Sequence, residues 1–292
     1  MDTELCQRTA VVTGAALGAG LARELAGRGM RVALLGLEGD RMEQVARDLP
    51  VEARCYEVDV TDDDAMGRVA AAVTDELGSP SVVIANAGIA EGGPFTTSDA
   101  ATWRRVIEVN LIGSAVTARA FLPALLTSHG YFLQIASTAA FGSAPLMSAY
   151  CASKAGAESF AQSLRAELAH QRVEVGIAYV HWIETDMIRD ADQHKVLREL
   201  RAHMPPGARR TYPVRQVAAW TARAVDHRST TVYAPPWLRL VQPLRPFLPL
   251  AVSAVSRRAL PRVARQGPVA QTGLLGGGGQ ADQEFRRERE RQ

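Results

Sequence analysis

The chain has 292 residues, of which 47% are hydrophobic, so it can bury a large core in one domain or two. Its formal net charge is only +2, from 33 basic and 31 acidic side chains, which removes the electrostatic reason to expect a nucleic-acid partner. Three cysteines without CxxC spacing indicate neither a disulfide framework nor a metal site. The N-terminus has no apolar signal segment, and no uninterrupted apolar stretch approaches the ~20 residues of a membrane span. We therefore expect a cytoplasmic protein with a small-molecule partner.

Short apolar segments alternate along the chain with longer stretches of helical periodicity. Strands are predicted at 8–14, 31–35, 53–58, 81–86, 131–137, 173–180 and 230–234. Helices are predicted near 18–28, 39–48, 62–77, 98–128, 148–170 and 213–227. This alternation predicts a Rossmann-type, doubly wound α/β domain over residues 1–236, in which helices cover both faces of a parallel sheet.

The C-terminal part of the chain differs in composition. Four prolines lie among Leu, Phe, Val and Arg between Trp237 and Arg265, which predicts an extension over 237–266 that forms only short helices. Such a segment could be an apolar cover over a substrate pocket or dimer face, which we favour, or an Arg-flanked segment at a membrane surface. Residues 267–292 join a glycine run to a charged stretch and predict a mobile tail.

A glycine-rich segment, TGAALGAG at 13–20, follows a predicted strand and opens a predicted helix. Gly14, Gly18 and Gly20 stand where the backbone must turn tightly and approach a pyrophosphate, with Ala16 and Leu17 in the same turn. The helix N-terminus offers free N–H donors and the positive end of its dipole to the phosphates. The segment predicts a dinucleotide site, although glycines at such spacing also occur in ordinary turns.

A tyrosine and a lysine in YCASK suggest an acid–base centre. Tyr150 and Lys154 are four residues apart on a predicted helix, so their side chains share one face. Lysine occurs only at 154 and 195, whereas the chain uses arginine elsewhere. A compact ammonium beside a phenol lowers the phenol's pKa from about 10 by favouring the phenolate. The alternative is a solvated lysine next to a packed tyrosine.

The TGxxxGxG spacing and the YCASK segment resemble the short-chain dehydrogenase/reductase family, and the resemblance extends over about residues 8–235. It implies that Asp59, followed by Val60, accepts a hydrogen bond from the adenine amino group. It also implies that Asn86, Ala87 and Gly88 support the sheet beneath the cofactor. Without the resemblance, Asp59 would be read as a helix cap and the Asn86–Gly88 segment as a turn.

The same resemblance assigns the catalytic residues. Ser137, thirteen residues before Tyr150, would bind the substrate oxygen, and Asn110 would help hold a water that connects Lys154 to solvent. Tyr150 would exchange a proton with the substrate oxygen while hydride passes between the substrate and the nicotinamide, whose ribose Lys154 holds. The chain is thus expected to be an NAD(P)-dependent oxidoreductase that forms a homodimer or homotetramer.

The end of the second predicted strand bears on the choice between NAD and NADP. Gly36 stands where NAD-preferring relatives carry Asp, and Leu37 where NADP-preferring relatives carry Arg. Glu38 is close enough to bind the ribose hydroxyls and repel a 2′-phosphate, which favours NAD. The alternatives are a solvated Glu38 and an NADPH-dependent carbonyl reductase.

The chain departs from the family's pattern after the sixth predicted strand. Val180 and His181 replace the usual Pro-Gly beside the nicotinamide, while Ile183 and Thr185 would still face the carboxamide. We expect His181 to pack against the cofactor; alternatively it reaches the substrate and adds pH dependence. Residues 186–204, which include Met187, correspond by the same resemblance to the family's mobile substrate lid, and their mixture of apolar and charged residues suits an amphipathic flap.

Apolar residues in the lid and the extension favour a hydrophobic alcohol or ketone as substrate, such as a steroid, lipid or terpenoid. A hypothesis from another class is a non-catalytic, dinucleotide-binding regulator. The usual signature of such a protein is loss of the tyrosine or lysine, and this chain has both.

Overall fold

The central sheet has seven strands in the order β3-β2-β1-β4-β6-β7-β8, and all its neighbouring pairs are parallel. The computed structural model describes residues 5–265 and 269–291. In the order of the sheet, the strands are β3 (Ala53–Glu57), β2 (Arg31–Gly36), β1 (Thr9–Thr13), β4 (Pro80–Ala85), β6 (Tyr131–Ser137), β7 (Glu174–Val180) and β8 (Thr231–Ala234). The predicted Rossmann-type sheet is confirmed.

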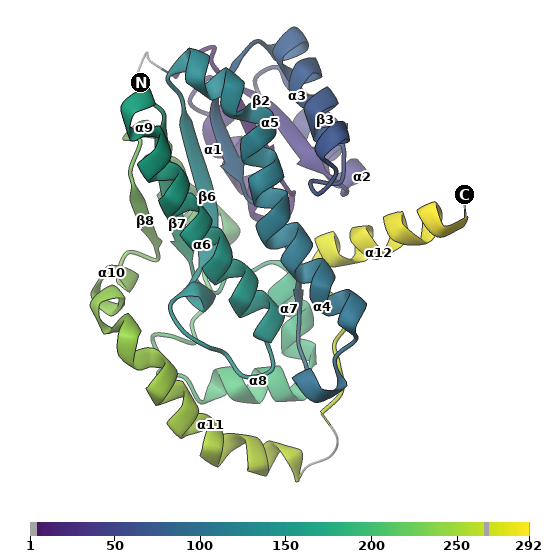
Figure 1. Cartoon of the computed structure of the whole chain (residues 1–292), viewed down its shortest axis with the longest axis vertical. Coiled ribbons are helices and arrows are strands. Elements are labelled where there is room, and N and C mark those ends of the chain that lie inside the picture. The colour runs from purple at the N-terminus through teal and green to yellow at the C-terminus, as the bar shows by residue number, and fades with distance from the viewer. Residues whose placement is uncertain (1–4, 266–268, 292) are drawn as a thin grey trace.

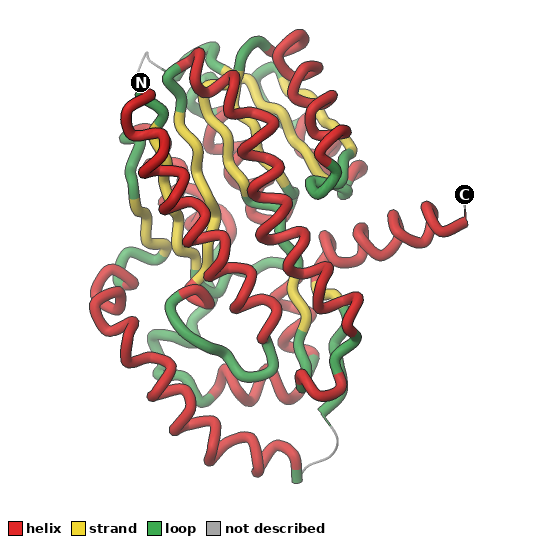
Figure 2. The backbone as a smooth tube through the Cα atoms, in the orientation of Figure 1, coloured by secondary structure: helices red, strands yellow, loops and turns green. Residues whose placement is uncertain are grey.

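Helices cover both faces of this sheet (Figures 1 and 2). One face carries α1 (Ala16–Ala26), α2 (Gly39–Arg47) and α9 (Val214–Asp226), and the other carries α3 (Asp63–Leu77), α5 (Gly113–Ser128) and α6 (Ser148–Leu168). Because successive strand residues point to opposite faces, Val12 packs into the first core and Val11 into the second. The alternating apolar runs of the sequence are therefore explained by two separate cores.

The predicted long helix near 98–128 is a continuous helical stretch with an irregular centre. It consists of α4 (Ala100–Ile107), the π-helical turn η2 (Glu108–Ile112) and α5. By length and composition alone, residues 100–128 could span a bilayer, but half of the apolar window is buried and α5 packs on β4. We read it as a core helix, and its π turn carries Asn110.

The direction of strand addition reverses between β1 and β4, which lie side by side at the middle of the sheet. In open α/β sheets, ligands bind in the crevice outside the carboxyl ends of the strands at such a switch point. Gly14 follows β1 and Asn86 follows β4, so both predicted cofactor segments begin at this crevice.

The extension contains one helix that is longer than predicted. It forms α10 (Leu238–Val241), the 3-10 helix η5 (Gln242–Phe247) and the 17-residue α11 (Leu248–Ala264). The expectation of short helices only is wrong for α11, because Pro249 falls in its first turn, where a missing N–H is tolerated. No other proline interrupts it before Pro261.

The expectation of a mobile tail is wrong for the described part of 267–292; residues 267, 268 and 292 lie outside the described residues. Strand β9 (Leu274–Leu275) pairs antiparallel with β5 (Ala90–Glu91), and α12 (Gly276–Arg291) follows it. Figure 1 shows α12 starting at the body of the molecule and projecting away from it. The segment is ordered by contacts with distant residues, which its glycine-rich and charged composition does not reveal.

Candidate active site

A cleft with about 1030 Å³ of empty volume, partly open to solvent, lies at the switch point of the sheet. Many of the residues singled out from the sequence line it. These are Gly14, Ala16, Leu17, Glu38, Asp59, Val60, Asn86, Ala87, Gly88, Tyr150, Lys154, Ile183, Thr185 and Met187. The fold thus brings segments from all along the domain to one cavity.

The glycine turn is held against the end of β4. Gly14 adopts a φ of +74°, and a Cβ at this position would lie 2.9 Å from the Cα of Ala87, so only glycine fits. The Asn86 side chain donates to the carbonyl oxygen of Thr13 at 2.7 Å, and the Thr13 hydroxyl accepts from the backbone of Asn86 and Ala87. The first turn of α1, which begins at Ala16, has no side-chain cap. Its N–H groups therefore suit a pyrophosphate.

The other two glycines of the motif lie outside the residues that line the cleft. A Cβ on Gly20 would lie 2.9 Å from side-chain atoms of Val214 and Ala218, so this glycine allows α1 to pack closely on α9. A Cβ on Gly18 would lie 3.2 Å from both Val12 and Asn86. We infer that Gly18 and Gly20 serve close packing rather than direct contact with the cofactor.

The Glu38 side chain is hydrogen-bonded to the backbone of the glycine turn. Its Oε2 accepts a hydrogen bond from the backbone N–H of Ala15 at 2.9 Å, and its side chain is only 10% exposed. The other carboxylate oxygen, Oε1, lies 3.7 Å from Nη1 of Arg41 and accepts no hydrogen bond from any residue that the structure describes. A buried acceptor without a donor at the end of β2 fits a ribose hydroxyl.

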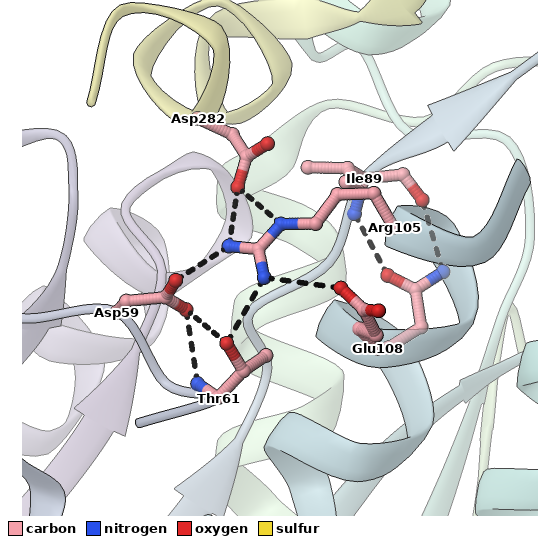
Figure 3. A network of polar contacts seen from close by, with 7 residues as sticks. Asp59, Thr61, Ile89, Arg105, Glu108 and Asp282 are labelled. Atoms are coloured by element: carbon pink, nitrogen blue, oxygen red, sulfur yellow. Dashed lines mark hydrogen bonds and ion pairs between the residues drawn. The ribbon is translucent and has the colours of Figure 1, made fainter. Parts of the chain in front are cut away.

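Asp59 is already engaged by protein donors (Figure 3). One oxygen accepts from the backbone and hydroxyl of Thr61, and the other accepts from Nη2 of Arg105 at 2.6 Å. Burial alone would raise the pKa of Asp59, but hydrogen bonds from Thr61 and the charge of Arg105 outweigh it and hold the pKa below its usual value. An adenine amino group would therefore have to share this carboxylate with Arg105.

Tyr150 and Lys154 lie on the same face of α6, as the four-residue spacing predicts. The Lys154 ammonium is 5.9 Å from the centre of the Tyr150 ring and donates to the carbonyl oxygen of Ile135 at 3.3 Å. Burial lowers the pKa of Lys154 to about 8. Burial also raises the pKa of Tyr150, and the Ser137 hydroxyl opposes this only partly. The expected lowering of the phenol pKa is thus wrong for the protein by itself, because loss of hydration is the largest influence on the phenol.

Ser137 ends β6 close to this pair. It is 8% exposed, and its hydroxyl accepts a hydrogen bond from the backbone N–H of Ala139 at 3.2 Å. The Ser137 hydroxyl also lowers the pKa of Tyr150, in opposition to burial. Ser137, Tyr150 and Lys154 are therefore assembled by β6 and α6.

Asn110 is fully buried, and its side chain forms hydrogen bonds mainly with backbone groups. Its side chain accepts from the N–H of Ile89 at 2.8 Å and donates to the carbonyl oxygen of Ile89 and the hydroxyl of Ser153, both at 2.9 Å. Each of these groups belongs to a segment beside Gly88 or Lys154. The π turn turns Asn110 inward, and π-helical turns are frequent at functional sites.

His181 lies outside the residues that line the cleft. Its Nδ1 is 3.0 Å from the hydroxyl of Thr138, and its Nε2 is 2.5 Å from the carbonyl oxygen of Ala208. Its ring packs edge-on against Trp237, with the ring centres 5.5 Å apart. Burial lowers the pKa of His181 to about 4, so the imidazole is neutral at physiological pH. This speaks against the alternative in which His181 adds pH dependence near neutrality.

The sequence interpretation missed one wall of the cleft. Leu275, Gly276, Gly277, Gly278 and Asp282 line it from the C-terminal segment, and Arg105 lines it from α4. Two signals were present in the sequence: Arg105 lies on the apolar face that also carries Val109, and the glycine run follows a short apolar pair. A strand, a glycine run and a helix in succession are also the pattern of a phosphate-binding turn.

Comparison with known proteins places this geometry in a family. The sequence profile of the short chain dehydrogenase family matches residues 8–196. The cis-4-hydroxycyclohexanecarboxylate dehydrogenase of Sinomonas cyclohexanicum is 32% identical over 229 residues, which are 76% of this chain and 87% of that protein. An uncharacterized oxidoreductase of Myxococcus xanthus is 36% identical over 195 residues, 63% of this chain and 75% of that protein.

Two solved structures share the fold. A metagenomic short-chain oxidoreductase in complex with NADP has 33% identity and a TM-score of 0.58, covering 60% of this chain and 83% of its own. An NAD⁺-bound xylitol dehydrogenase has 22% identity and a TM-score of 0.70, covering 79% of this chain and 98% of its own. The sequence profile spans more than half of the chain, and both relatives are named as oxidoreductases or dehydrogenases. This chain is a member of the short-chain dehydrogenase family and an oxidoreductase that acts with NAD or NADP.

Proposed function

We propose that the protein interconverts a secondary alcohol and a carbonyl in a mainly apolar molecule, with NAD as the preferred cofactor. The observation that carries this proposal is that Tyr150 and Lys154 line the same cleft as the Gly14 turn. When bound, the dinucleotide supplies the hydride donor or acceptor, and the protein supplies orientation and electrostatics.

Three side chains would handle the proton. The partly buried Tyr150 keeps its phenol proton at neutral pH, since loss of hydration raises its pKa, and it can donate that proton to a carbonyl oxygen that Ser137 orients. Lys154 keeps its charge below a pKa of about 8 and can bind ribose hydroxyls. Asn110 fixes the Ile89 backbone and Ser153, and so positions the segments that carry Gly88 and Lys154.

A screen of apolar secondary alcohols and ketones, followed by nicotinamide absorbance, tests this function. Met187 and Leu275 pack in one apolar cluster with Tyr150, which supports a hydrophobic substrate such as a steroid, lipid or terpenoid. Turnover of members of this panel but not of small polar polyols is the expected result. Dinucleotide binding without turnover of any compound would favour the regulator hypothesis instead.

The cofactor preference depends on Glu38. We expect the protein to bind NADH at least about ten-fold more tightly than NADPH, because a carboxylate beside a 2′-phosphate is repulsive. Glu38→Gln removes the charge but keeps the shape, and it should abolish most of this difference in Kd, measured by fluorescence titration. Glu43→Gln, an exposed position on α2, is the matched control and should change neither Kd. A clear preference of the unmodified protein for NADPH would refute the role of Glu38.

The extension has an inner and an outer face. Leu238 and Ala259 are buried, and Arg245 forms an ion pair with Glu158, so the inner face packs on the domain. The outer face is apolar. Seven large hydrophobic side chains are exposed among the described residues, and five of them lie on this face, at 240, 244, 247, 250 and 255. Residues 237–265 contain six arginines and no carboxylate. We propose that this face contacts anionic lipid headgroups.

Liposome flotation tests the lipid contact. The protein should float with vesicles that contain anionic lipid and should remain unbound with neutral vesicles or at high salt. Phe247→Glu should abolish flotation. Phe95→Glu is a matched control, because Phe95 is 69% exposed and Phe247 is 65% exposed. Failure of the unmodified protein to float with anionic vesicles would leave the extension as a cover only.

A further inference from the structure

The C-terminal segment, defined here as residues 271–291, runs along the mouth of the cofactor cleft. The N–H of Thr272 donates to the carbonyl oxygen of Gly92 at 2.8 Å, and β9 then pairs with β5. The N–H of Gly276 donates to Oδ2 of Asp190 at 2.9 Å. Gly276 has a φ of +80°, and a Cβ there would lie 2.8 Å from the backbone nitrogen of Met187. The segment is therefore fitted against the body by contacts that only glycine allows.

The first turn of α12 lies between the ends of β2 and β4. A Cβ on Gly277 would lie 3.6 Å from Oε1 of Glu38, and a Cβ on Gly278 would lie 3.8 Å from the carbonyl oxygen of Gly88. Glu38, Asp59 and Val60 also line the cleft, and Gly88 lies beside the catalytic pair, since a Cβ on Gly88 would be 3.3 Å from Nζ of Lys154. The C-terminal segment is thus part of the cleft wall between Glu38 and Gly88.

Asp282 is anchored there by Arg105 (Figure 3). Its Oδ1 accepts from Nε of Arg105 at 2.8 Å and from Nη2 at 2.6 Å. The Asp282 side chain is 2% exposed, and its second oxygen, Oδ2, accepts no hydrogen bond from residues 5–265 or 269–291. Asp282 also lines the cleft. A buried carboxylate oxygen without a donor is costly, and a ligand donor would remove that cost.

The three carboxylates that line this part of the cleft differ in how many of their oxygens accept hydrogen bonds from the protein. Asp59 has both oxygens occupied by Thr61 and Arg105. Glu38 and Asp282 each have one buried oxygen for which the described chain provides no hydrogen-bond donor. The adenosine half of a dinucleotide carries donors of the matching kind, namely ribose hydroxyls and the exocyclic amino group of adenine.

We propose that Asp282 binds the adenine amino group through Oδ2, so that α12 completes the cofactor site and retains the dinucleotide. This inference rests on the proposed use of NAD and adds a binding residue from outside the Rossmann domain. Arg105 positions Asp282 and at the same time occupies Asp59. The adenine is thus recognised by the C-terminal helix rather than by the carboxylate at the end of the third strand.

Titration with two reduced dinucleotides tests the inference without turnover. NADH carries the amino group, whereas reduced nicotinamide hypoxanthine dinucleotide carries a carbonyl oxygen, an acceptor, at the same place. The unmodified protein should bind NADH at least about ten-fold more tightly than the hypoxanthine analogue. In Asp282→Asn the Kd for NADH should rise about ten-fold, and the ratio between the two ligands should fall to within about three-fold.

Control variants separate binding from structure. Glu284→Gln, at an exposed position on the same helix, should leave both Kd values unchanged. Asp59→Asn should retain the preference for NADH over the hypoxanthine analogue. The inference would be overturned if Asp59→Asn lost this preference while Asp282→Asn kept it. Tighter NADH binding by Asp282→Asn would also overturn it, because the segment would then obstruct the cleft. Absence of any dinucleotide binding by the unmodified protein would instead refute the proposed function. Thermal unfolding of each variant verifies that it is folded.

Discussion

Replacing Tyr150 with Phe is expected to lower kcat by about a hundred- to ten-thousand-fold, the range that a positioned acid–base group contributes. The change removes the phenol oxygen and keeps the ring, which packs in the apolar cluster that also holds Met187 and Leu275. The Kd for NADH should therefore remain nearly unchanged. Turnover is measured by nicotinamide absorbance with a substrate from the screen, and the Kd by fluorescence titration.

Tyr233→Phe provides the matched control for this experiment. Tyr233 lies on β8, where its ring stacks on Tyr179 with the ring centres 5.6 Å apart. Removing its hydroxyl should leave kcat unaltered, because it lies outside the residues that line the cleft. If Tyr150→Phe retained full turnover, the proton would have to come from another group, and the assigned mechanism would be wrong.

Replacing Arg105 with Met is expected to lower the free energy of unfolding by about 3–5 kcal/mol, the cost of removing one partner from a buried ion pair. The Arg105 side chain is 7% exposed and pairs with Asp59 and Asp282, which are themselves buried. Without the guanidinium, two carboxylates remain in a poorly hydrated place. Urea unfolding at pH 7 measures the loss.

A surface ion pair on the following helix is the control. Arg119 lies 2.8 Å from Asp63, but the two side chains are 72% and 58% exposed. Arg119→Met should therefore cost less than about 1 kcal/mol. If both variants lost the same free energy of unfolding, the network around Arg105 would not hold the C-terminal segment to the domain.

The decrease in the free energy of unfolding caused by Arg105→Met should depend on pH. Hydrogen bonds and the charge of Arg105 hold the pKa of Asp59 below the usual value near 3.8, despite the opposing effect of burial. A carboxylate with a lowered pKa in the folded state contributes stability above its unfolded pKa, and this contribution is lost as the pH falls through the folded pKa. The difference between the two proteins should thus be largest at neutral pH and should narrow as the pH falls, because the unpaired, poorly hydrated carboxylates of the variant take up protons first.

Local sequence determined the fold, the Tyr150–Lys154 pair and the glycine turn. The alternation of apolar runs with helical periodicity predicted the doubly wound sheet, because each strand and helix must bury its own apolar residues. The four-residue spacing placed Tyr150 and Lys154 on one face of α6, since the geometry of a helix fixes that relation. Gly14 indicated a tight turn, because glycine adopts a positive φ readily and leaves room for a close approach of the backbone.

Only the tertiary structure decided the wall that the C-terminal segment adds to the site and the ionisation of the site's groups. Residues 274–291 are too polar and glycine-rich to order by themselves, and they are held by β5, Asp190 and Arg105, which are distant in sequence. The direction of the pKa shift of Tyr150 likewise depends on how many elements exclude water from the phenol. Periodicity and spacing predict the relations between residues that are close in the sequence. Burial and ion pairing depend instead on which distant segments come into contact.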